Sequence, residues 1–216
     1  MPRYLCWPMH RERLGKGLDG WPHPVSRAAL PLAMQVSGVP CLLRELHGMA
    51  PARMLAAYDA LSEESIYLRF MRPKRTPPPE QVAQFLNYHP EQQISLLLTD
   101  LTDLAGEPLA QAQSIRRRLH PDRAEFSCIV ADHFQHKGAG RRILLALALL
   151  ARADGIREWT AEVLAQNRPM LTLLKRLGLP LTLVTGREMV FVRLDLSVLD
   201  AWLPVPPAAP LKTKGE

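Results

Sequence analysis

The strongest structural signal in the chain is the stretch Gln135-His136-Lys137-Gly138-Ala139-Gly140-Arg141-Arg142, which follows an apolar run at 126–131. The two glycines allow a tight turn and a close approach of the backbone to a ligand. Apolar residues then continue to about residue 153 at a length that suits a buried helix. The first turn of such a helix offers unpaired N–H groups and the positive end of the helix dipole, so the stretch predicts a strand, a phosphate-binding turn and a helix.

Two other nucleotide-binding motifs are excluded at this turn. The P-loop pattern, Gly-x4-Gly-Lys followed by Ser or Thr, is absent, and Ile143 stands where a dinucleotide-binding fingerprint has its third glycine. What remains is Gln-x-x-Gly-x-Gly. A plain glycine connection between a strand and a helix has the same form, so the turn alone leaves both interpretations open.

The flanking sequence alternates between strand-like and helix-like segments. This alternation predicts an α+β or mixed-sheet α/β domain. The expected strands are 39–46, 94–101, 109–119, 124–131, 158–164, 181–185 and 189–196. The expected helices are 52–61, a short one capped by Ser62, 80–86, the helix after the glycine turn, and 168–177.

Composition sets the limits of the domain and its class. Residues 1–37 are rich in Pro, Gly, Arg and His and are expected to form an irregular N-terminal extension, followed by the folded domain at 38–202 and a flexible tail at 203–216. The longest apolar run, 143–151, cannot span a bilayer, and no secretory signal is evident, so a cytoplasmic protein with no membrane partner is expected. The three cysteines are scattered and no zinc-ligand spacing occurs, so no disulfide framework and no metal site are expected.

The net charge of +6 is compatible with a nucleic-acid ligand, but the pattern disfavours one. Most basic residues are dispersed, and the one local run, 116–118, has no interleaved aromatic residues of the kind that stack on bases. A nucleic-acid-binding domain therefore stays the weakest of the functional interpretations, and the charge is interpreted as basic residues dispersed over the surface.

Three blocks in the chain together resemble one family. Gln135–Gly140 resembles the Gln/Arg-x-x-Gly-x-Gly/Ala motif of the GNAT superfamily of N-acetyltransferases, and residues 163–178 are similar to its strand–Asn–helix–Leu-Gly segment. Residues 61–70 resemble the start of the acetyltransferase domain of bacterial protein lysine acetyltransferases of the Pat type. The resemblance covers about 39–196. It implies a mixed, mostly antiparallel central sheet of about seven strands, flanked by about four helices.

The resemblance also implies a function and a cofactor site. The expected activity is transfer of an acetyl group from acetyl-CoA to an amine acceptor, with a protein lysine as the candidate, and no metal. The family binds acetyl-CoA where the fourth and fifth strands separate. The residues expected to bind it here are Val130 by its backbone, the turn residues Gln135, His136, Lys137, Gly138, Ala139, Gly140 and Arg141, and Asn167. A helix N-cap is the alternative role for Asn167.

For catalysis, the resemblance assigns the general base to Glu125, which would take a proton from the acceptor ammonium. The alternative is a solvated glutamate that pairs with the arginines at 116–118. Leu174 stands where many relatives have a tyrosine that protonates the leaving thiolate, and Leu179-Pro180 replaces the usual phenylalanine. These departures leave a second interpretation open, a non-catalytic coenzyme A-binding regulatory module. Cys128 is expected to be a core residue.

Overall fold

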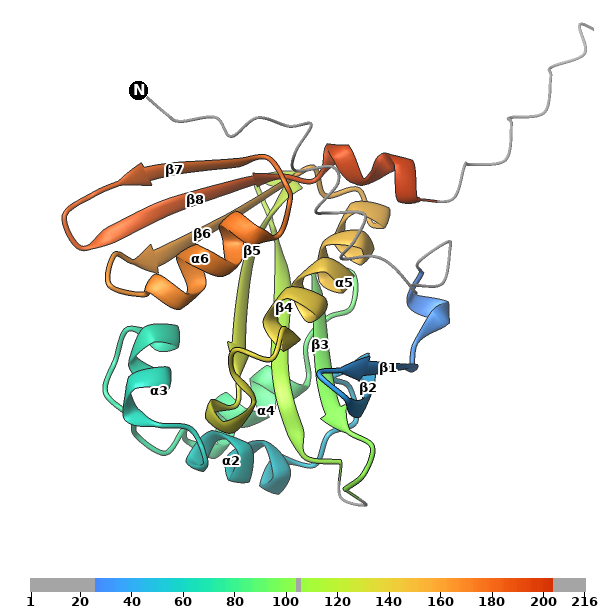
Figure 1. Ribbon diagram of the computed structural model, residues 1–216, viewed down its shortest axis with the longest axis vertical. Coiled ribbons are helices and arrows are strands. Elements are labelled where there is room, and N and C mark those ends of the chain that lie inside the picture. Colours follow the sequence, from blue (N-terminus) through green and yellow to red (C-terminus); the bar gives the residue numbers. More distant parts are fainter. Residues whose placement is uncertain (1–25, 104–105, 204–216) are drawn as a thin grey trace, which may run out of the picture.

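A computed structural model describes residues 26–103 and 106–203 of the 216-residue chain. Its centre is an eight-stranded sheet in the order β1-β2-β3-β4-β5-β6-β8-β7 (Figure 1). All neighbouring strands pair antiparallel except β5 and β6, which are parallel. The strands are β1 (Leu32–Val36), β2 (Val39–Glu45), β3 (Gln93–Asp100), β4 (Pro108–Arg117), β5 (His120–Val130), β6 (Glu158–Leu164), β7 (Leu181–Thr185) and β8 (Met189–Asp195).

Helices cover both faces of this sheet. The α-helices of the described part are α2 (Pro51–Asp59), α3 (Glu63–Phe70), α4 (Pro79–Leu86), α5 (Ala139–Ala153) and α6 (Arg168–Arg176). Short 3-10 helices are η1 (Arg27–Ala29), η2 (Asp132–Phe134) and η3 (Ser197–Trp202). The predicted fold class is confirmed. The described residues contain one strand more than the expected seven. Their five α-helices correspond to the five expected from the sequence pattern, one more than the resemblance implied.

The additional strand is β1, which lies in the segment expected to be irregular. Its residues alternate, with Leu32, Met34 and Val36 packed with the main core while the intervening side chains are exposed. Val36 pairs with Val39 across the two-residue turn Ser37-Gly38, whose φ angles of 50° and 82° are both positive, as a tight hairpin turn requires. The expectation of irregular structure is therefore wrong for η1 and β1. Residues 1–25 of the expected extension and residues 204–216 of the expected tail lie outside the described residues.

The core explains why the β3 and α5 sequences are apolar throughout. Six consecutive residues of β3 are buried, because α5 packs with Leu96 and Leu98 on one face and a second cluster packs with Leu97 on the other. That second cluster includes Val82 and Leu86 of α4. In α5, every residue from Ile143 to Ala151 is buried. The nine-residue apolar run is therefore a core helix, and no helix among the described residues has the length and apolarity to cross a membrane.

Candidate active site

The sheet opens between its two parallel strands. The β5–β6 ladder contains only three pairs, Arg123 with Glu158, Ala124 with Trp159 and Glu125 with Thr160. Beyond Glu125, β5 stays paired with β4 as far as Val130, and β6 stays paired with β8 as far as Leu164. The two strands thus separate from each other while each keeps its outer partner. A cleft of about 1530 Å³ begins at this point and is lined by both strands, α3, α6 and the glycine turn.

The glycine turn closes one end of the cleft with free backbone donors. Gly138 is the N-cap of α5 and has φ +85° and ψ 0°, the left-handed region, and His136 is also left-handed with φ +59°. Within the described residues, none of the five backbone amides of His136–Gly140 has a hydrogen-bond acceptor. Consecutive free amides at the start of a 15-residue helix are suited to bind an anion such as a pyrophosphate.

Gly140 has a steric role that differs from that of Gly138. A Cβ built at Gly140 would lie 3.0 Å from Cδ2 of Leu173 and 3.4 Å from Cγ2 of Val130, both residues that line the cleft. A Cβ at Gly138 would meet nothing within 4 Å. Gly140 is therefore needed for close packing between α5 and α6, whereas Gly138 is needed for its backbone conformation.

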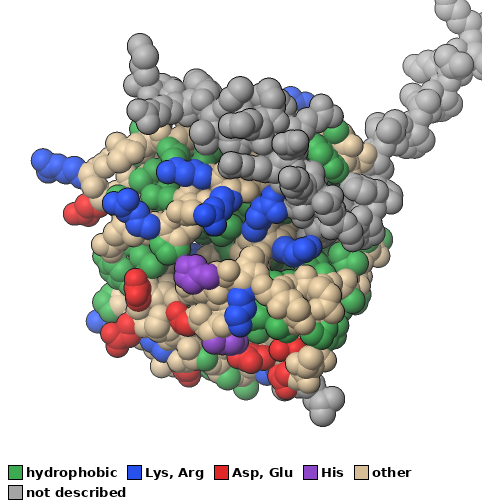
Figure 2. All heavy atoms as spheres, in the orientation of Figure 1, with side chains coloured by type: hydrophobic (Ala, Val, Ile, Leu, Met, Phe, Trp, Pro, Cys, Tyr) green, Lys and Arg blue, Asp and Glu red, His purple; other side chains and the backbone are tan. Residues whose placement is uncertain are grey.

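Basic side chains surround this end of the cleft. Arg141, Arg168 and Arg176 line it, and Arg141 Nε donates to the carbonyl of Arg176 at 3.1 Å. Burial lowers the pKa of Arg141, and the neighbouring Arg142 lowers it further. Lys and Arg side chains gather over the α5 and α6 region in the space-filling view (Figure 2). This charge suits a ligand with several phosphates.

Helix α3 is joined to the glycine turn by a hydrogen-bond network. Asp132, directly after β5, accepts from Ser62 N at 2.8 Å, Ser62 Oγ at 2.9 Å and Ser65 Oγ at 2.6 Å. Gln135 Nε2 donates to Ser65 Oγ at 3.1 Å. Burial raises the pKa of Asp132, but the bonds from Ser65 and Ser62 outweigh it and leave the pKa below its ordinary value. The start of α3 is thus positioned by the predicted motif residue Gln135.

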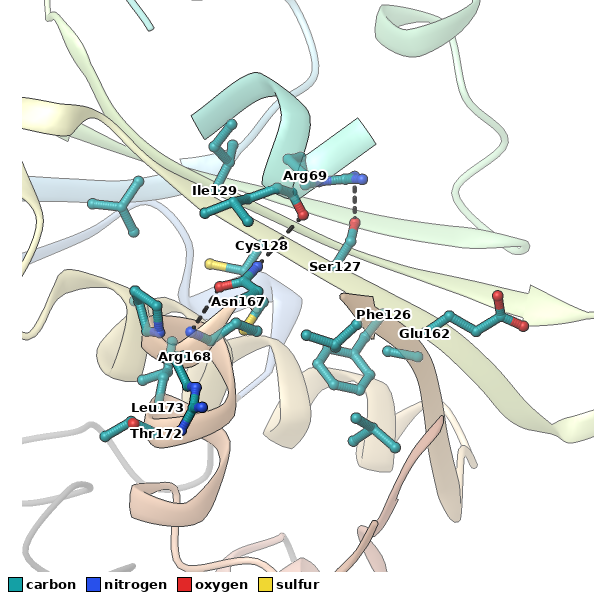
Figure 3. Close-up of a pocket in the computed structure, with 18 of the residues that line it drawn as sticks. Arg69, Phe126, Ser127, Cys128, Ile129, Glu162, Asn167, Arg168, Thr172 and Leu173 are labelled. Atoms are coloured by element: carbon teal, nitrogen blue, oxygen red, sulfur yellow. Dashed lines mark hydrogen bonds between the residues drawn. The ribbon is translucent and has the colours of Figure 1, made fainter. Parts of the chain in front are cut away.

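Asn167 joins the other end of α3 to α6. Its Oδ1 accepts from Met170 N at 3.1 Å, which makes it the N-cap of α6, and its Nδ2 donates to the carbonyl of Leu68 at 3.4 Å (Figure 3). The N-cap interpretation of Asn167 is therefore observed. The residue also lines the cleft, so its predicted contact with the cofactor stays a prediction.

Glu125 lies at the point where the ladder ends. Ala124, Phe126 and Cys128 face the core, so Glu125, Ser127 and Ile129 face the opposite side of β5, toward α3. Glu125 is exposed in the cleft and is not in an ion pair with the arginines at 116–118 within the described part of the chain. The alternative interpretation of Glu125 as one half of a surface ion pair is thus not observed.

Strand register adds residues to this face that sequence reasoning missed. Phe191 lies directly opposite Glu162, and Val184 lies opposite Phe191, so the three side chains share one face. All three line the cleft, and Phe191 and Val184 are 50% and 57% exposed. Among the described residues Glu162 has no hydrogen bond or ion pair. In the close-up its carboxylate lies at the end of the cleft away from Asn167 and Arg168 (Figure 3).

The cleft brings together most of the predicted site residues. Those that line it are Glu125, Val130, Gln135, His136, Gly138, Ala139, Gly140, Arg141 and Asn167. Lys137 is not among the residues that line it. Its Nζ lies 5.0 Å from the centre of the Phe134 ring, and its carbonyl accepts from Ser37 Oγ. The described residues contain no group of three or more side chains suited to a metal ion.

Two further expectations concern Cys128 and Leu174. Cys128 is buried, as expected of a core residue, and burial raises the pKa of its thiol to about 12, while Arg69 lowers it. Leu174 is completely buried in the main core. The described part of α6 therefore offers no proton donor at the position where many relatives carry a tyrosine.

Comparison with known proteins agrees with this geometry. Residues 58–179 match the sequence model of the Acetyltransferase (GNAT) family. Acetyltransferase Pat of Mycolicibacterium smegmatis is 31% identical over 102 residues, which make up 47% of this chain and 28% of that protein. The chain thus spans less than a third of this relative's length.

Solved structures share the fold. The GNAT domain of PAT from S. lividans superposes with a TM-score of 0.68 at 24% identity, over 76% of this chain and 96% of that one. The yncA acetyltransferase from Salmonella typhimurium, solved with its cofactor acetyl-CoA, gives a TM-score of 0.57 at 20% identity, over 79% and 97% of the two chains.

Proposed function

The chain belongs to the GNAT family of acetyltransferases, and we propose that it transfers an acetyl group from acetyl-CoA to a primary amine. The observation that carries this proposal is the cleft between β5 and β6, which has free backbone amides at one end and Glu125 where the strands separate. The amides of the turn bind the pyrophosphate, and the backbone of Val130 binds the pantetheine arm. The arginines around the turn add attraction for phosphate.

In this mechanism Glu125 is the general base. The acceptor arrives as an ammonium and gives a proton to Glu125, directly or through one water. The neutral nitrogen forms a bond to the thioester carbonyl carbon, the carbon–sulfur bond breaks, coenzyme A leaves as a thiolate, and the acylated nitrogen releases its second proton to solvent. Since Leu174 is buried in the core and has no proton to donate, the thiolate leaves without a proton from that position.

Glu125, Glu162, Val184 and Phe191 line the part of the cleft that we call the acceptor face. A lysine side chain of a protein is the acceptor that best fits it. The exposed Phe191 and Val184 offer apolar contact to a long aliphatic stem, and Glu162 and Glu125 attract its charged end. The resemblance of residues 61–70 to Pat-type lysine acetyltransferases supports the same acceptor. A protein acceptor also agrees with the exposure of this face, because a small amine needs less open surface.

The test measures coenzyme A release from acetyl-CoA with a panel of lysine peptides and small amines. Glu125→Gln should lower kcat by about 100-fold or more, the range for loss of a general base. Glu64→Gln is the matched control, since Glu64 is an exposed carboxylate that also lines the cleft, and it should keep its activity. Full turnover by the Glu125 variant would remove Glu125 from the mechanism. Tight binding of acetyl-CoA without release on the whole panel would favour the non-catalytic module.

A further inference from the structure

The α3 side of the cleft contains a cation in a fixed position that has no role in the proposed mechanism. Arg69, in the last turn of α3, lines the cleft, and its Nη2 donates to Ser127 Oγ at 2.5 Å (Figure 3). The guanidinium carbon lies 4.8 Å from the centre of the Phe70 ring. Its Nε is buried and has no hydrogen-bond acceptor within the described residues. The side chain is thus held in one place with donor capacity left over.

The position of Arg69 relative to Glu125 follows from the strand. Ser127, which anchors Arg69, is two residues after Glu125 and faces the same side of β5, about 7 Å along the strand. Arg69 and Glu125 form no ion pair within 4.0 Å in the described part of the chain. Burial lowers the pKa of Arg69, while Cys128 and Glu125 raise it, and a guanidinium stays charged at neutral pH. A cation and a carboxylate therefore face the acceptor side at separate points.

We propose that Arg69 is a fixed positive charge beside the acceptor nitrogen, which disfavours the protonated amine and raises the fraction present as the free-base nucleophile. This inference rests on the proposed acetyl transfer to an amine. A free lysine side chain has a pKa near 10.4, so only about one in 2,500 is neutral at pH 7. A like charge near an ammonium disfavours its charged form. Glu125 accepts the proton of the acceptor ammonium, and the positive charge of Arg69 makes the loss of that proton easier.

Other charges at the cleft do not take over this role. Arg117 of β4 is exposed, so solvent screens its charge, and Arg193 of β8 is paired with Glu158 at 3.3 Å. Arg69 differs because it is anchored and largely withdrawn from water, where a charge acts more strongly. Apart from Arg141, Arg168 and Arg176 at the phosphate end, the ionisable groups that line the cleft are Glu64 and Arg69 of α3, Arg117 of β4, Glu125 and Cys128 of β5, Asp132 and His136 after β5, Glu162 of β6 and Arg193 of β8.

The experiment compares Arg69→Met with Arg72→Met. Arg72 is exposed, does not line the cleft, and lies over the same Phe70 ring at 5.6 Å. Arg72→Met therefore removes a cation and a contact with this ring, as Arg69→Met does, but removes no charge from the cleft. The values of kcat and KM are measured from pH 6 to 10 with saturating acetyl-CoA and the blocked lysine Nα-acetyl-lysine amide. A calorimetric titration with acetyl-CoA checks that each variant keeps the cofactor site.

For Arg69→Met, the pH of half-maximal kcat should rise by about one unit, which lowers kcat at pH 7 by up to about tenfold, a difference that shrinks toward pH 10. The KM should not rise, because the ammonium form is no longer repelled. Arg69→Lys should restore the wild-type profile, and Arg72→Met should leave it unchanged. A loss of rate that is equal at every pH, or an unshifted profile, would overturn the inference.

Two controls separate this outcome from other failures. If Arg69→Met does not fold, Ser127→Ala keeps the charge but removes its anchor, and it should shift the profile in the same direction by less. An unshifted Ser127→Ala profile would then overturn the inference. If the wild-type protein releases no coenzyme A with the blocked lysine, the lysine acceptor itself fails, which is a result distinct from an unshifted profile in an active enzyme.

Discussion

Replacement of Gly138 by alanine tests the glycine turn, because the structure separates its backbone cost from any packing cost. Gly138 has φ +85°, and a Cβ there would meet no heavy atom within 4 Å. The cost of Gly138→Ala is therefore the left-handed conformation alone, about 1–2 kcal/mol for an L-residue. In a domain of this size, each kcal/mol lowers Tm by about 2–4 °C, so the expected decrease is about 2–8 °C.

A second glycine supplies the matched control. Gly155, after the end of α5, has φ +89° and also has open space around its Cβ position, but it does not line the cleft. Gly155→Ala should lower Tm by a similar amount. Only Gly138→Ala should weaken the binding of acetyl-CoA, because the turn relieves its strain by rotating the amides of His136–Gly140. If that relaxation costs the same 1–2 kcal/mol, affinity falls by about 5- to 30-fold.

The assay is thermal unfolding together with a calorimetric titration with acetyl-CoA for the wild-type protein and both variants. A similar loss of affinity in both variants would mean that the effect is general destabilisation. Unchanged affinity in Gly138→Ala, together with a lower Tm, would refute the inference that this turn binds the pyrophosphate.

Three other predictions concern the elements around the cleft. Asp132→Asn should destabilise the protein more at pH 7 than at pH 3, as measured by urea unfolding. The folded-state pKa of Asp132 lies below its unfolded value, so its contribution to stability begins to be lost as pH falls below about 4 and decreases further as pH falls through the folded-state pKa. An equal difference at both pH values would contradict this. Asn167→Asp should keep the N-cap of α6, whereas Asn167→Ala should lower the free energy of unfolding by about 1 kcal/mol. Both variants lose the hydrogen bond from Nδ2 to the Leu68 carbonyl, so they differ only in the cap. Equal stability of the two variants would argue against the cap. Cys128 should resist alkylation at pH 8 in the folded protein and react after unfolding, because it is buried and its thiol pKa is about 12; mass spectrometry of the labelled peptides would reveal rapid native labelling if this is wrong.

Much of the fold could be predicted because local signals agreed with tertiary packing. The buried run of β3, the helix after Gly138 and the cap at Ser62 each have a pattern of apolar, turn or capping residues within a short window. β1 was missed because Pro and Gly around it outweighed five alternating residues. The Ser37-Gly38 pair was the local signal that could have found it, since serine–glycine pairs mark turns.

The candidate site likewise contains residues that could be predicted from the sequence and residues that could not. The free backbone donors of His136–Gly140 are contiguous in sequence, so a motif was enough to locate them. Glu162 and Phe191 lie in no motif, and the block 61–70 that contains Arg69 gave no role to this residue. The roles of all three depend on where strand register and helix packing place them. A shift of one residue in the β6–β8 ladder would turn Glu162 and Phe191 to opposite faces.

The amino-acid sequence therefore specified the family, the glycine turn and the order of most elements, because each depends on interactions between residues that are near neighbours in the chain. Only the tertiary structure decided that β5 and β6 separate after Glu125, that Lys137 lies outside the cleft, and that Arg69 is anchored on Ser127. These features arise from contacts between residues up to about a hundred positions apart, such as Asn167 with Leu68, and no local pattern encodes which partner such a side chain meets.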